Sequence, residues 1–284
     1  MSMEMSFIKR VWSNNASRAG LIIIAIILLF AIAAPIISPH NPNLQDYDKI
    51  LKPPSFSNLL GTDQYGRDVL SRIIYGTKVS LGVGIFAAFI ALVLGTMVGS
   101  IAGLLGGWAD RLLMRLVDIL LGFPKLFVLL LAVGIGSPSI LLTVLVLGFL
   151  SWMEIARIVR GEVIVVKEQM YVKSAAALGL GKVRIIFKYI VPNIAGQIVV
   201  SLTLLVSTMI LVEASLSFLG LGVQPPTASW GTLLNQGRID PLGAWWISMF
   251  TGVFIVVTVV GFNLFGDGLR NVLNPRSGRR LQNK

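Results

Sequence analysis

The stretch that decides the fold is VSLGVGIFAAFIALVLGTMVGSIAGLL, residues 79–105, which contains no charged residue. A helix needs about 20 mostly apolar residues to cross the hydrocarbon core of a bilayer, and this run is long enough. Small residues recur in it every four positions, so they share one line along a helix. The run therefore predicts a membrane-spanning helix with a groove that a second backbone can approach closely. The small residues of this groove are Ala87, Ala91, Gly95, Gly99, Gly103 and Gly107.

Two interpretations of this groove are open at the level of sequence. Gly95, Gly99, Gly103 and Gly107 either pack against another helix of the same bundle, or form a surface along which helices slide during a conformational cycle. Both need close approach of two backbones, so the spacing alone does not separate them.

The composition of the whole chain agrees with a membrane protein. Of the 284 residues, 55% are hydrophobic and 13% are charged, whereas soluble domains are about a quarter charged. There is no cysteine and only one histidine, His40, so the sequence offers no thiolate nucleophile and no multi-histidine metal site. The sequence also lacks the G-x-x-x-x-G-K-[ST] phosphate-binding loop. We therefore predict an all-α membrane protein that is not an enzyme and binds no metal or cofactor itself.

Five further apolar runs extend the prediction to about six spans. They are expected at residues 19–37, 111–136, 139–158, 190–216 and 244–265. The first run could also be read as a cleaved signal peptide, because Ala31-Ile32-Ala33 resembles a cleavage site. Its apolar core is longer than the roughly 7–15 residues of a signal peptide, so we expect a retained span.

The distribution of basic residues predicts the orientation. The net charge is +11, from 24 Lys and Arg against 13 Asp and Glu. If the N-terminus is cytoplasmic, 17 basic residues fall in inside segments and six in outside segments, with Lys125 inside a span. Cytoplasmic loops of membrane proteins collect Lys and Arg. The sequence thus predicts that both termini are cytoplasmic, and the basic charge requires no nucleic-acid partner.

The segment between the fourth and fifth spans is predicted to form an elbow below the membrane. Residues 168–178, EQMYVKSAAAL, have strong helix-forming composition and place Tyr171, Ala175 and Leu178 on one stripe. Gly179 and Gly181 follow as helix-ending signals, and a second helical stretch leads to Pro192 at the start of the fifth span. A membrane protein without a nucleotide site of its own would need such an elbow to receive force from a soluble partner.

This elbow resembles the EAA motif of the permease subunits of bacterial ABC importers. The glycine falls six residues after the first motif position, and the proline falls thirteen residues later. In that family the loop forms a coupling helix that docks on the ATP-binding subunit. Lys173 stands where the family usually has glutamate and Ser174 replaces the first alanine, so the lysine implies a matching acidic residue on the partner. The residues to which this resemblance assigns coupling to the ATPase are Tyr171, Lys173, Ser174, Ala175, Ala176, Gly179 and Pro192.

Three further stretches resemble the dipeptide, oligopeptide and nickel branch of this family, and its second, shorter (C-type) permease subunit in particular. They are LGTDQYGRD at residues 60–68, EASLSFLGLG at 213–222 with QPP at 224–226, and GDGLR at 266–270 with NPR at 274–276. The four motifs follow one another in the expected order and cover nearly the whole chain.

The resemblance implies an ABC importer permease with six spans, located in a bacterial or archaeal cell membrane. Its implied partners are a homologous permease subunit in a heterodimer, two ATP-binding subunits that hold ATP and Mg²⁺, and an extracytoplasmic substrate-binding protein. The expected organisation is a cytoplasmic or interfacial segment at 1–18, the first span at 19–37, an extracytoplasmic loop at 38–78, a five-helix permease core at 79–270 with the coupling loop at 160–190, and a cytoplasmic tail at 271–284. Peptides are the expected substrate, with nickel, metallophore complexes and glutathione-like compounds as alternatives.

Several charged or polar residues outside the elbow have two interpretations each. Those of the outer loop either fold it through Asp–Arg pairs or dock a binding protein. Glu213 either lines the pathway or forms an ion pair within the bundle. The segment 224–243 suits a re-entrant or interfacial segment over the pathway, with Trp230, Trp245 and Trp246 at the depth of the lipid headgroups. The candidates for pathway lining or docking are Asp63, Arg67, Asp68, Arg72, Glu213, Gln224 and Trp230.

An ion-driven secondary transporter is the competing class. Such transporters often contain inverted repeats and helices broken near the middle of the membrane. The sequence shows no convincing repeat and few acidic residues within the spans, which favours the ATP-driven class.

Overall fold

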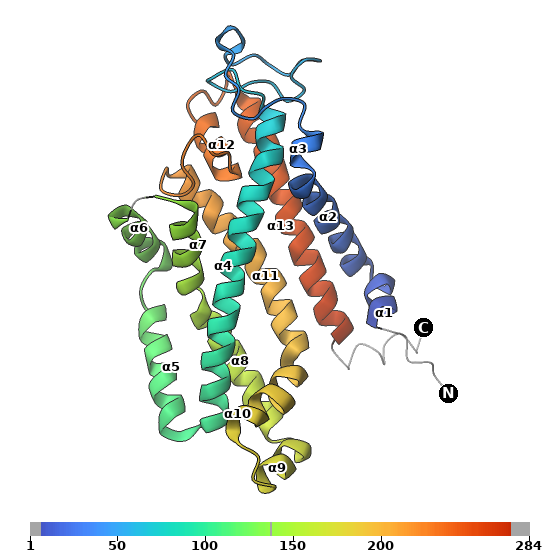
Figure 1. Ribbon diagram of the computed structural model, residues 1–284, viewed down its shortest axis with the longest axis vertical. Helices are drawn as coiled ribbons and strands as arrows, with labels where there is room; N and C mark the ends of the chain where they lie inside the picture. The colour runs from blue at the N-terminus through green and yellow to red at the C-terminus, as the bar shows by residue number, and fades with distance from the viewer. Residues whose placement is uncertain (1–6, 137, 274–284) are drawn as a thin grey trace.

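The computed structural model describes residues 7–136 and 138–273 of the chain (Figure 1). Helices dominate this part of the chain, and the only β-structure in it is an isolated bridge between Thr62 and Asp68. The elements are α1 (Phe7–Ser13), α2 (Asn15–Ile32), α3 (Ala34–Ile37), η1 (Tyr47–Lys49), α4 (Val69–Leu105), α5 (Gly107–Leu121), α6 (Lys125–Ile135), α7 (Ile140–Phe149), α8 (Trp152–Lys167), α9 (Met170–Ala177), α10 (Lys182–Ile185), η2 (Ile186–Ile190), α11 (Val191–Phe218), α12 (Trp230–Gly237) and α13 (Trp245–Leu273).

Five helical segments are long and apolar enough to cross a membrane: Asn15–Ile32, Val69–Leu105, Ile140–Lys167, Lys182–Phe218 and Trp245–Leu273. They confirm an all-α membrane protein. The remaining expected span, residues 111–136, falls on α5 and α6, so the prediction of one continuous helix there is wrong. Pro124 is the physical reason, because proline has no backbone N–H for the helical ladder and disfavours helical geometry in the residue before it.

The long helices form a bundle in which α4 is central (Figure 1). Helices α5 and α6 follow each other along one side, next to α8 and α7. The elbow of α9 and α10 projects from one end of the bundle, and the segment between α3 and α4 covers the opposite end together with α12. The start of α1 and the end of α13 both point towards the end that carries the elbow, as expected for two termini on one side of a membrane.

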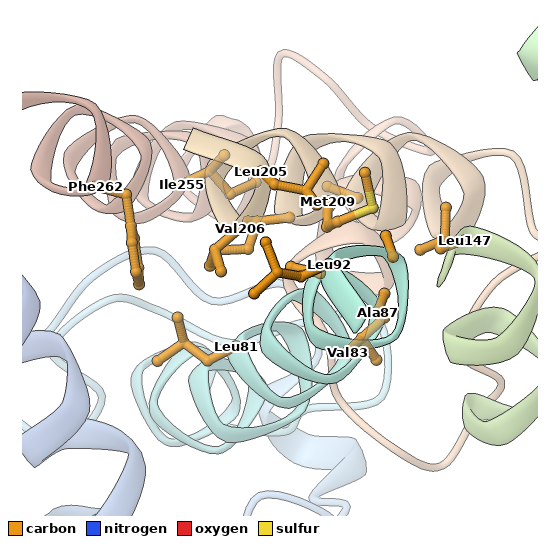
Figure 2. Packing of buried hydrophobic residues seen from close by; sticks show 14 of the residues in the cluster. Leu81, Val83, Ala87, Leu92, Leu147, Leu205, Val206, Met209, Ile255 and Phe262 are labelled. Carbon is orange, nitrogen blue, oxygen red and sulfur yellow. The ribbon is translucent and has the colours of Figure 1, made fainter. Parts of the chain in front are cut away.

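The core lies between α4 and α11, with contributions from α7 and α13 (Figure 2). Leu81, Val83, Ala87 and Leu92 of α4 belong to this core together with Leu205, Val206 and Met209 of α11, and all of these side chains are buried. Because lipid is as apolar as leucine, such packing in a membrane depends on close fit rather than on the hydrophobic effect.

Close fit is most evident where α2 crosses α13. A β-carbon added at Gly20 would lie 2.6 Å from the carbonyl oxygen of Gly261, and one added at Gly268 would lie 2.5 Å from the backbone nitrogen of Ser17. These glycines allow the two backbones to touch. Val11 of α1 also packs on α11 and α13, so the segment before the first span contains a helix that contacts the bundle, while its place in the membrane interface stays a prediction.

The boundaries of the outer loop differ from the expected 38–78. Helix α4 begins at Val69, because the Asp68 side chain caps it by accepting a hydrogen bond from the backbone N–H of Ser71 at 2.8 Å. The chain turns at Gly61 and Gly66, which have positive φ angles of 75° and 70°. Residues 274–276 of the last motif and most of the expected tail lie outside the described residues.

Candidate functional site

The elbow is built as a short helix with a defined end. In α9, the N–H of Gly179 donates to the carbonyl of Ala176 and the N–H of Leu180 donates to that of Ala175. This pair of bonds is the Schellman arrangement, which requires a left-handed residue after the helix. Gly179 supplies it with a φ of +77°, so its predicted role as the helix-ending residue is confirmed.

The elbow exposes apolar side chains away from the bundle. Val172 and Ala175 form its buried face, whereas Met170 is 77% exposed and Leu178 is 82% exposed. The predicted stripe of Tyr171, Ala175 and Leu178 is therefore divided, because Ala175 faces the bundle and the other two face outwards. Ser174 and Ala176 are exposed as well, and Pro192 lies in the first turn of α11.

Lys173 has a partner within its own chain. Its Nζ lies 2.8 Å from Oε2 of Glu168, and both side chains are more than half exposed. The hydrogen bond from Lys173 holds the pKa of the Glu168 carboxyl below its usual value. Exposed ion pairs contribute little to stability, so an acidic group on a docking partner can replace Glu168 at small cost.

The glycine groove of α4 is filled by α8 of the same chain. A β-carbon added at Gly99 would lie 2.5 Å from the carbonyl oxygen of Ala156, and one added at Gly95 would lie 2.6 Å from Cβ of Ile155. At Gly103 it would lie 2.8 Å from Cβ of Val163. Gly107 has no neighbour of this kind, because it is the first residue of α5. The packing interpretation thus describes three of the four glycines.

The other side of α8 is polar and faces α5 and α6. Arg160 holds Asp110 through two hydrogen bonds of 2.6 and 2.8 Å. Two further ion pairs join α8 to α5 and to α6, and we call the three pairs together the ion-pair ladder. Its three pairs are Asp110–Arg160, Asp118–Arg157 and Lys125–Glu154, the last with 3.5 Å between Nζ and Oε1.

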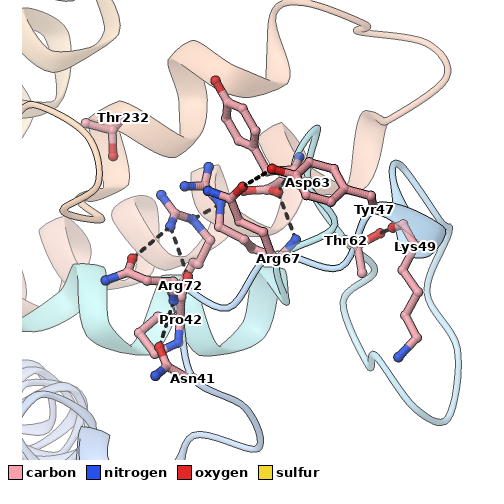
Figure 3. A network of polar contacts seen from close by, with 12 residues as sticks. Asn41, Pro42, Tyr47, Lys49, Thr62, Asp63, Arg67, Arg72 and Thr232 are labelled. Carbon is pink, nitrogen blue, oxygen red and sulfur yellow. Dashed lines mark hydrogen bonds and ion pairs between the residues drawn. The ribbon is translucent and has the colours of Figure 1, made fainter.

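The charged residues of the outer loop form a buried cluster (Figure 3). Oδ2 of Asp63 lies 2.7 Å from Nε of Arg67 and 3.4 Å from Nε of Arg72. Asp63 and Arg72 are fully buried, and a guanidinium nitrogen of Arg72 donates to the carbonyl of Pro42 at 3.0 Å. The predicted Asp–Arg pairing is therefore present for Asp63.

Asp68 is held differently from the expected arginine pairing. It accepts hydrogen bonds from the Asn58 amide at 2.9 Å and the Ser71 hydroxyl at 2.7 Å. Burial leaves these charged side chains no free surface for a binding protein. The side chains of the outer loop that a partner can reach are exposed ones such as Tyr47 and Phe56.

Glu213 is fully buried near the outer end of α11, and the predicted ion pair is wrong. Within the described residues its partners are hydroxyl groups: Ser80 of α4 donates at 2.9 Å and Ser217 at 2.7 Å. The Ser80 hydroxyl in turn accepts from the backbone N–H of Trp230 at 3.1 Å. Glu213 thus joins α4, α11 and the start of α12.

Hydrogen bonds fix both the start of α12 and the turn that follows α11. Trp230 is fully buried and donates from Nε1 to the carbonyl of Ile73, so its side chain packs inside the bundle, while its depth relative to the headgroups stays a prediction. Gln224 donates to the carbonyls of Gly220 and Gly222, which fixes the turn after α11. The serines around Glu213 were missed at the sequence level, since residues 80 and 213 are joined only by the fold.

Comparisons with known proteins agree on a transport role. Residues 95–279 match the family model of the binding-protein-dependent transport system inner membrane component, and residues 5–54 match the N-terminal TM domain of oligopeptide transport permease C. The chain is 39% identical to the dipeptide transport system permease protein DppC of Bacillus subtilis, over 95% of this chain and 85% of the relative.

Two other relatives are about as similar. The oligopeptide transport system permease protein OppC of Bacillus subtilis is 40% identical, over 97% of this chain and 90% of the relative. The glutathione transport system permease protein GsiD of Pectobacterium atrosepticum is 39% identical, over 95% and 90%.

Proposed function

The chain belongs to the binding-protein-dependent transport system inner membrane components, and from this premise we propose that it forms half of a pathway for imported peptides. It is a multi-pass, non-catalytic permease subunit of an ABC importer in a bacterial inner membrane. Family membership implies a binding protein and an ATPase as partners. We propose that the complete importer contains, beside this chain, one homologous permease and two ATP-binding subunits, which hold ATP and Mg²⁺.

Peptides are the proposed substrate because the relatives named for dipeptide and oligopeptide transport match nearly the full chain. Glutathione is the second candidate, since a permease named for it is as similar in sequence. The two candidates share peptide bonds and free carboxylates. They differ in the thiol and the γ-linkage of glutathione.

The observation that carries the proposal is the elbow. Its exposed apolar side chains, Met170, Tyr171, Leu178, Val183 and Phe187, project from the end of the bundle towards which the start of α1 and the end of α13 point. An exposed apolar surface of this kind marks a docking site for another protein. Basic side chains surround it, so the proposed partner surface on the ATPase is a cleft with apolar walls and acidic groups.

Replacing Gly179 with valine tests the role of the elbow. A β-carbon at this glycine meets no neighbour within 4 Å, so the penalty arises from the left-handed backbone, where an L-residue costs roughly 1–2 kcal/mol. We expect Gly179→Val to insert in the membrane normally and to lose peptide uptake while ATP hydrolysis continues. Reconstituted complexes with all partner subunits provide both rates.

Gly181→Val is the matched control. Gly181 also has open space around it, but its φ is −61°, which valine adopts without strain. Uptake should stay close to that of the wild type in this variant. Equal uptake by the wild type and Gly179→Val would contradict the coupling role.

Substrate identity is tested separately with the same proteoliposomes. Loaded with its binding protein, the complex should accumulate di- or oligopeptides in an ATP-dependent manner, and glutathione more slowly. Accumulation of glutathione alone would replace the first candidate by the second. ATPase activity of the purified chain without its partners would contradict the assignment as a non-catalytic subunit.

A further inference from the structure

Lys78 is a basic residue on the outer part of a spanning helix. It lies nine residues after α4 begins, about 14 Å along the helix at 1.5 Å per residue. Its side chain is exposed, and no acidic side chain of the described residues lies within ion-pair distance of it. A charge in a membrane-spanning segment is costly and faces protein or water, and it marks a functional site by default.

Next to Lys78 lies a cavity of about 400 Å³. Its walls are formed by one face of α4, the start of α7 and the residues before α12. Most of the lining is apolar, and Lys78 is the only charged residue among the described residues that line it. The main wall residues are Val79, Val83, Phe86, Ile140, Val144 and Ala228. Ligand sites in proteins typically have about 300–1,000 Å³ and a mainly apolar lining with few polar groups.

A second cleft of about 420 Å³ adjoins this cavity. The two share Pro42, Asn43 and Tyr75, and the second continues past Ser38 and His40 to the outer loop. Its lining is about as polar as it is apolar, in contrast to the first cavity. The combined space therefore runs from the polar outer loop to an apolar wall with one ammonium group.

An ammonium beside an apolar wall is complementary to an anion with an apolar body. We propose that this cavity, the Lys78 site, binds the C-terminal carboxylate of an incoming peptide together with its last side chain. The inference rests on the proposed peptide function and adds a residue that contacts the substrate. Every unmodified peptide has this carboxylate, so the site recognises peptides regardless of their sequence, while the apolar wall favours an apolar last residue.

Substitution of Lys78 provides the first test. In the reconstituted importer, Lys78→Met should lower uptake of a peptide with a free carboxylate and an apolar last residue by about tenfold, since hydrogen bonds to charged groups contribute at least that much to affinity. Lys78→Arg should retain most of the uptake. Lys52→Met is the matched control, because Lys52 is exposed on the same outer side and does not line the cavity.

Thiol labelling provides a second, independent test that does not require Lys78 to be changed. The chain contains no cysteine, so Val144→Cys places a single thiol of this chain on the cavity wall. Its alkylation in the full complex should slow at least threefold when peptide-loaded binding protein and ATP are present. A Ser57→Cys variant, next to Phe56 on the exposed outer loop, reports docking of the binding protein itself and should be alkylated equally with peptide-loaded and peptide-free binding protein, whereas the Val144→Cys thiol should be protected only by the peptide-loaded form.

The outcomes separate this inference from the proposed function. Wild-type peptide uptake with undiminished uptake in Lys78→Met overturns the site but leaves the function intact. Protection of the Val144→Cys thiol that follows the phosphatidylglycerol content of the vesicles and not the peptide also overturns it, because the occupant is then a lipid. Absence of any peptide uptake by the wild type overturns the proposed function itself.

Discussion

Helix α8 has two sides that are joined to the bundle by different means. Its apolar side fits the glycine groove of α4, where backbone and side-chain atoms lie within van der Waals contact of Gly95, Gly99 and Gly103. Its polar side meets α5 and α6 through the ion-pair ladder. The first seam has no spare volume, whereas the second combines a small buried apolar cluster of Val117, Met153 and Ala156 with charges of which several are half exposed.

The difference predicts which seam moves during a transport cycle. Close-packed interiors are bistable rather than continuously deformable, and Ile155, Val159 and Val163 occupy notches that only glycines leave open. Sliding α8 along α4 would lift these side chains out of their notches. Exposed ion pairs exchange partners at little cost, so we expect α4 and α8 to move as one body and the ladder to rearrange.

This arrangement gives the elbow a stiff connection to the core. Helix α8 ends at Lys167, whose Nζ donates to the carbonyl of Gly103 at 2.9 Å, and α9 begins three residues later. A displacement of α9 by a docked ATPase would therefore pass through α8 into α4. Of the two interpretations of the groove, the structure favours packing. We expect sliding to occur instead between α8 and the two helices, α5 and α6, that it meets through the ion-pair ladder.

The largest expected effect comes from filling the groove. Gly99→Leu places a side chain where the Ala156 carbonyl and Val159 already lie 2.5 and 2.9 Å from an added β-carbon. Overpacking a filled core costs typically about 1–3 kcal/mol or more, and here it also separates two backbones. We expect the variant to be poorly inserted, or to melt about 6–12 °C below the wild type in a detergent thermal-shift assay, taking the upper end of this cost at roughly 2–4 °C per kcal/mol.

Gly161→Leu is the control for this variant. Gly161 lies on α8 but has open space around it, and leucine is a better helix former than glycine by somewhat less than 1 kcal/mol. The control should therefore melt at or above the wild-type temperature. A Gly99→Leu protein that melts like the wild type would show that α4 and α8 are not locked together.

The sequence predicted the groove well and its partner not at all. A four-residue repeat of glycine is visible without a structure, because it depends only on helix periodicity. Any spanning helix with β-branched residues on one side could fill such a groove. That α8 fills it follows from the tertiary fold, in which Ile155, Val159 and Val163 come to lie against α4.

The elbow and the bundle interior show the same difference: contacts between residues close in sequence could be predicted, and contacts between distant residues could not. The end of α9 at Gly179 was predictable, since its hydrogen bonds connect residues only three and five apart. The hydroxyl partners of Glu213 were not, because Ser80 lies 133 residues away. The break before Pro124 was visible as a proline, but the apolar runs on both sides suggested one span.

A medium effect is expected from the least exposed pair of the ladder, Asp110–Arg160. Asp110 is 14% exposed and makes a bidentate contact to Arg160, the strong form of such a pair. Because Arg160 is about a third exposed, we expect Asp110→Asn to cost about 1 kcal/mol. The melting temperature should fall by roughly 2–4 °C, and less in high salt, where charges are screened.

Exchanging the two charges distinguishes the contribution of the ion pair to stability from the contribution of packing. Asp110→Arg with Arg160→Asp should recover part of the loss seen in either single reversal, as measured in a double-mutant cycle. If the double variant melts at the temperature expected from the sum of the single losses, Asp110 and Arg160 are not energetically coupled. The polar seam would then be held by packing, and the contrast between the two sides of α8 would disappear.

The smallest effect is expected at the other end of the ladder. Lys125 and Glu154 are 3.5 Å apart and 29% and 53% exposed, so Glu154→Gln should change the melting temperature by no more than about 1–2 °C. Transport gives the sharper test, because a pair that must open during the cycle slows transport when it is strengthened. Lys125→Arg, which can hold Glu154 with two hydrogen bonds, should lower the uptake rate while leaving the melting temperature unchanged or higher. An uptake rate that rises or stays constant in Lys125→Arg would place the moving seam elsewhere in the bundle.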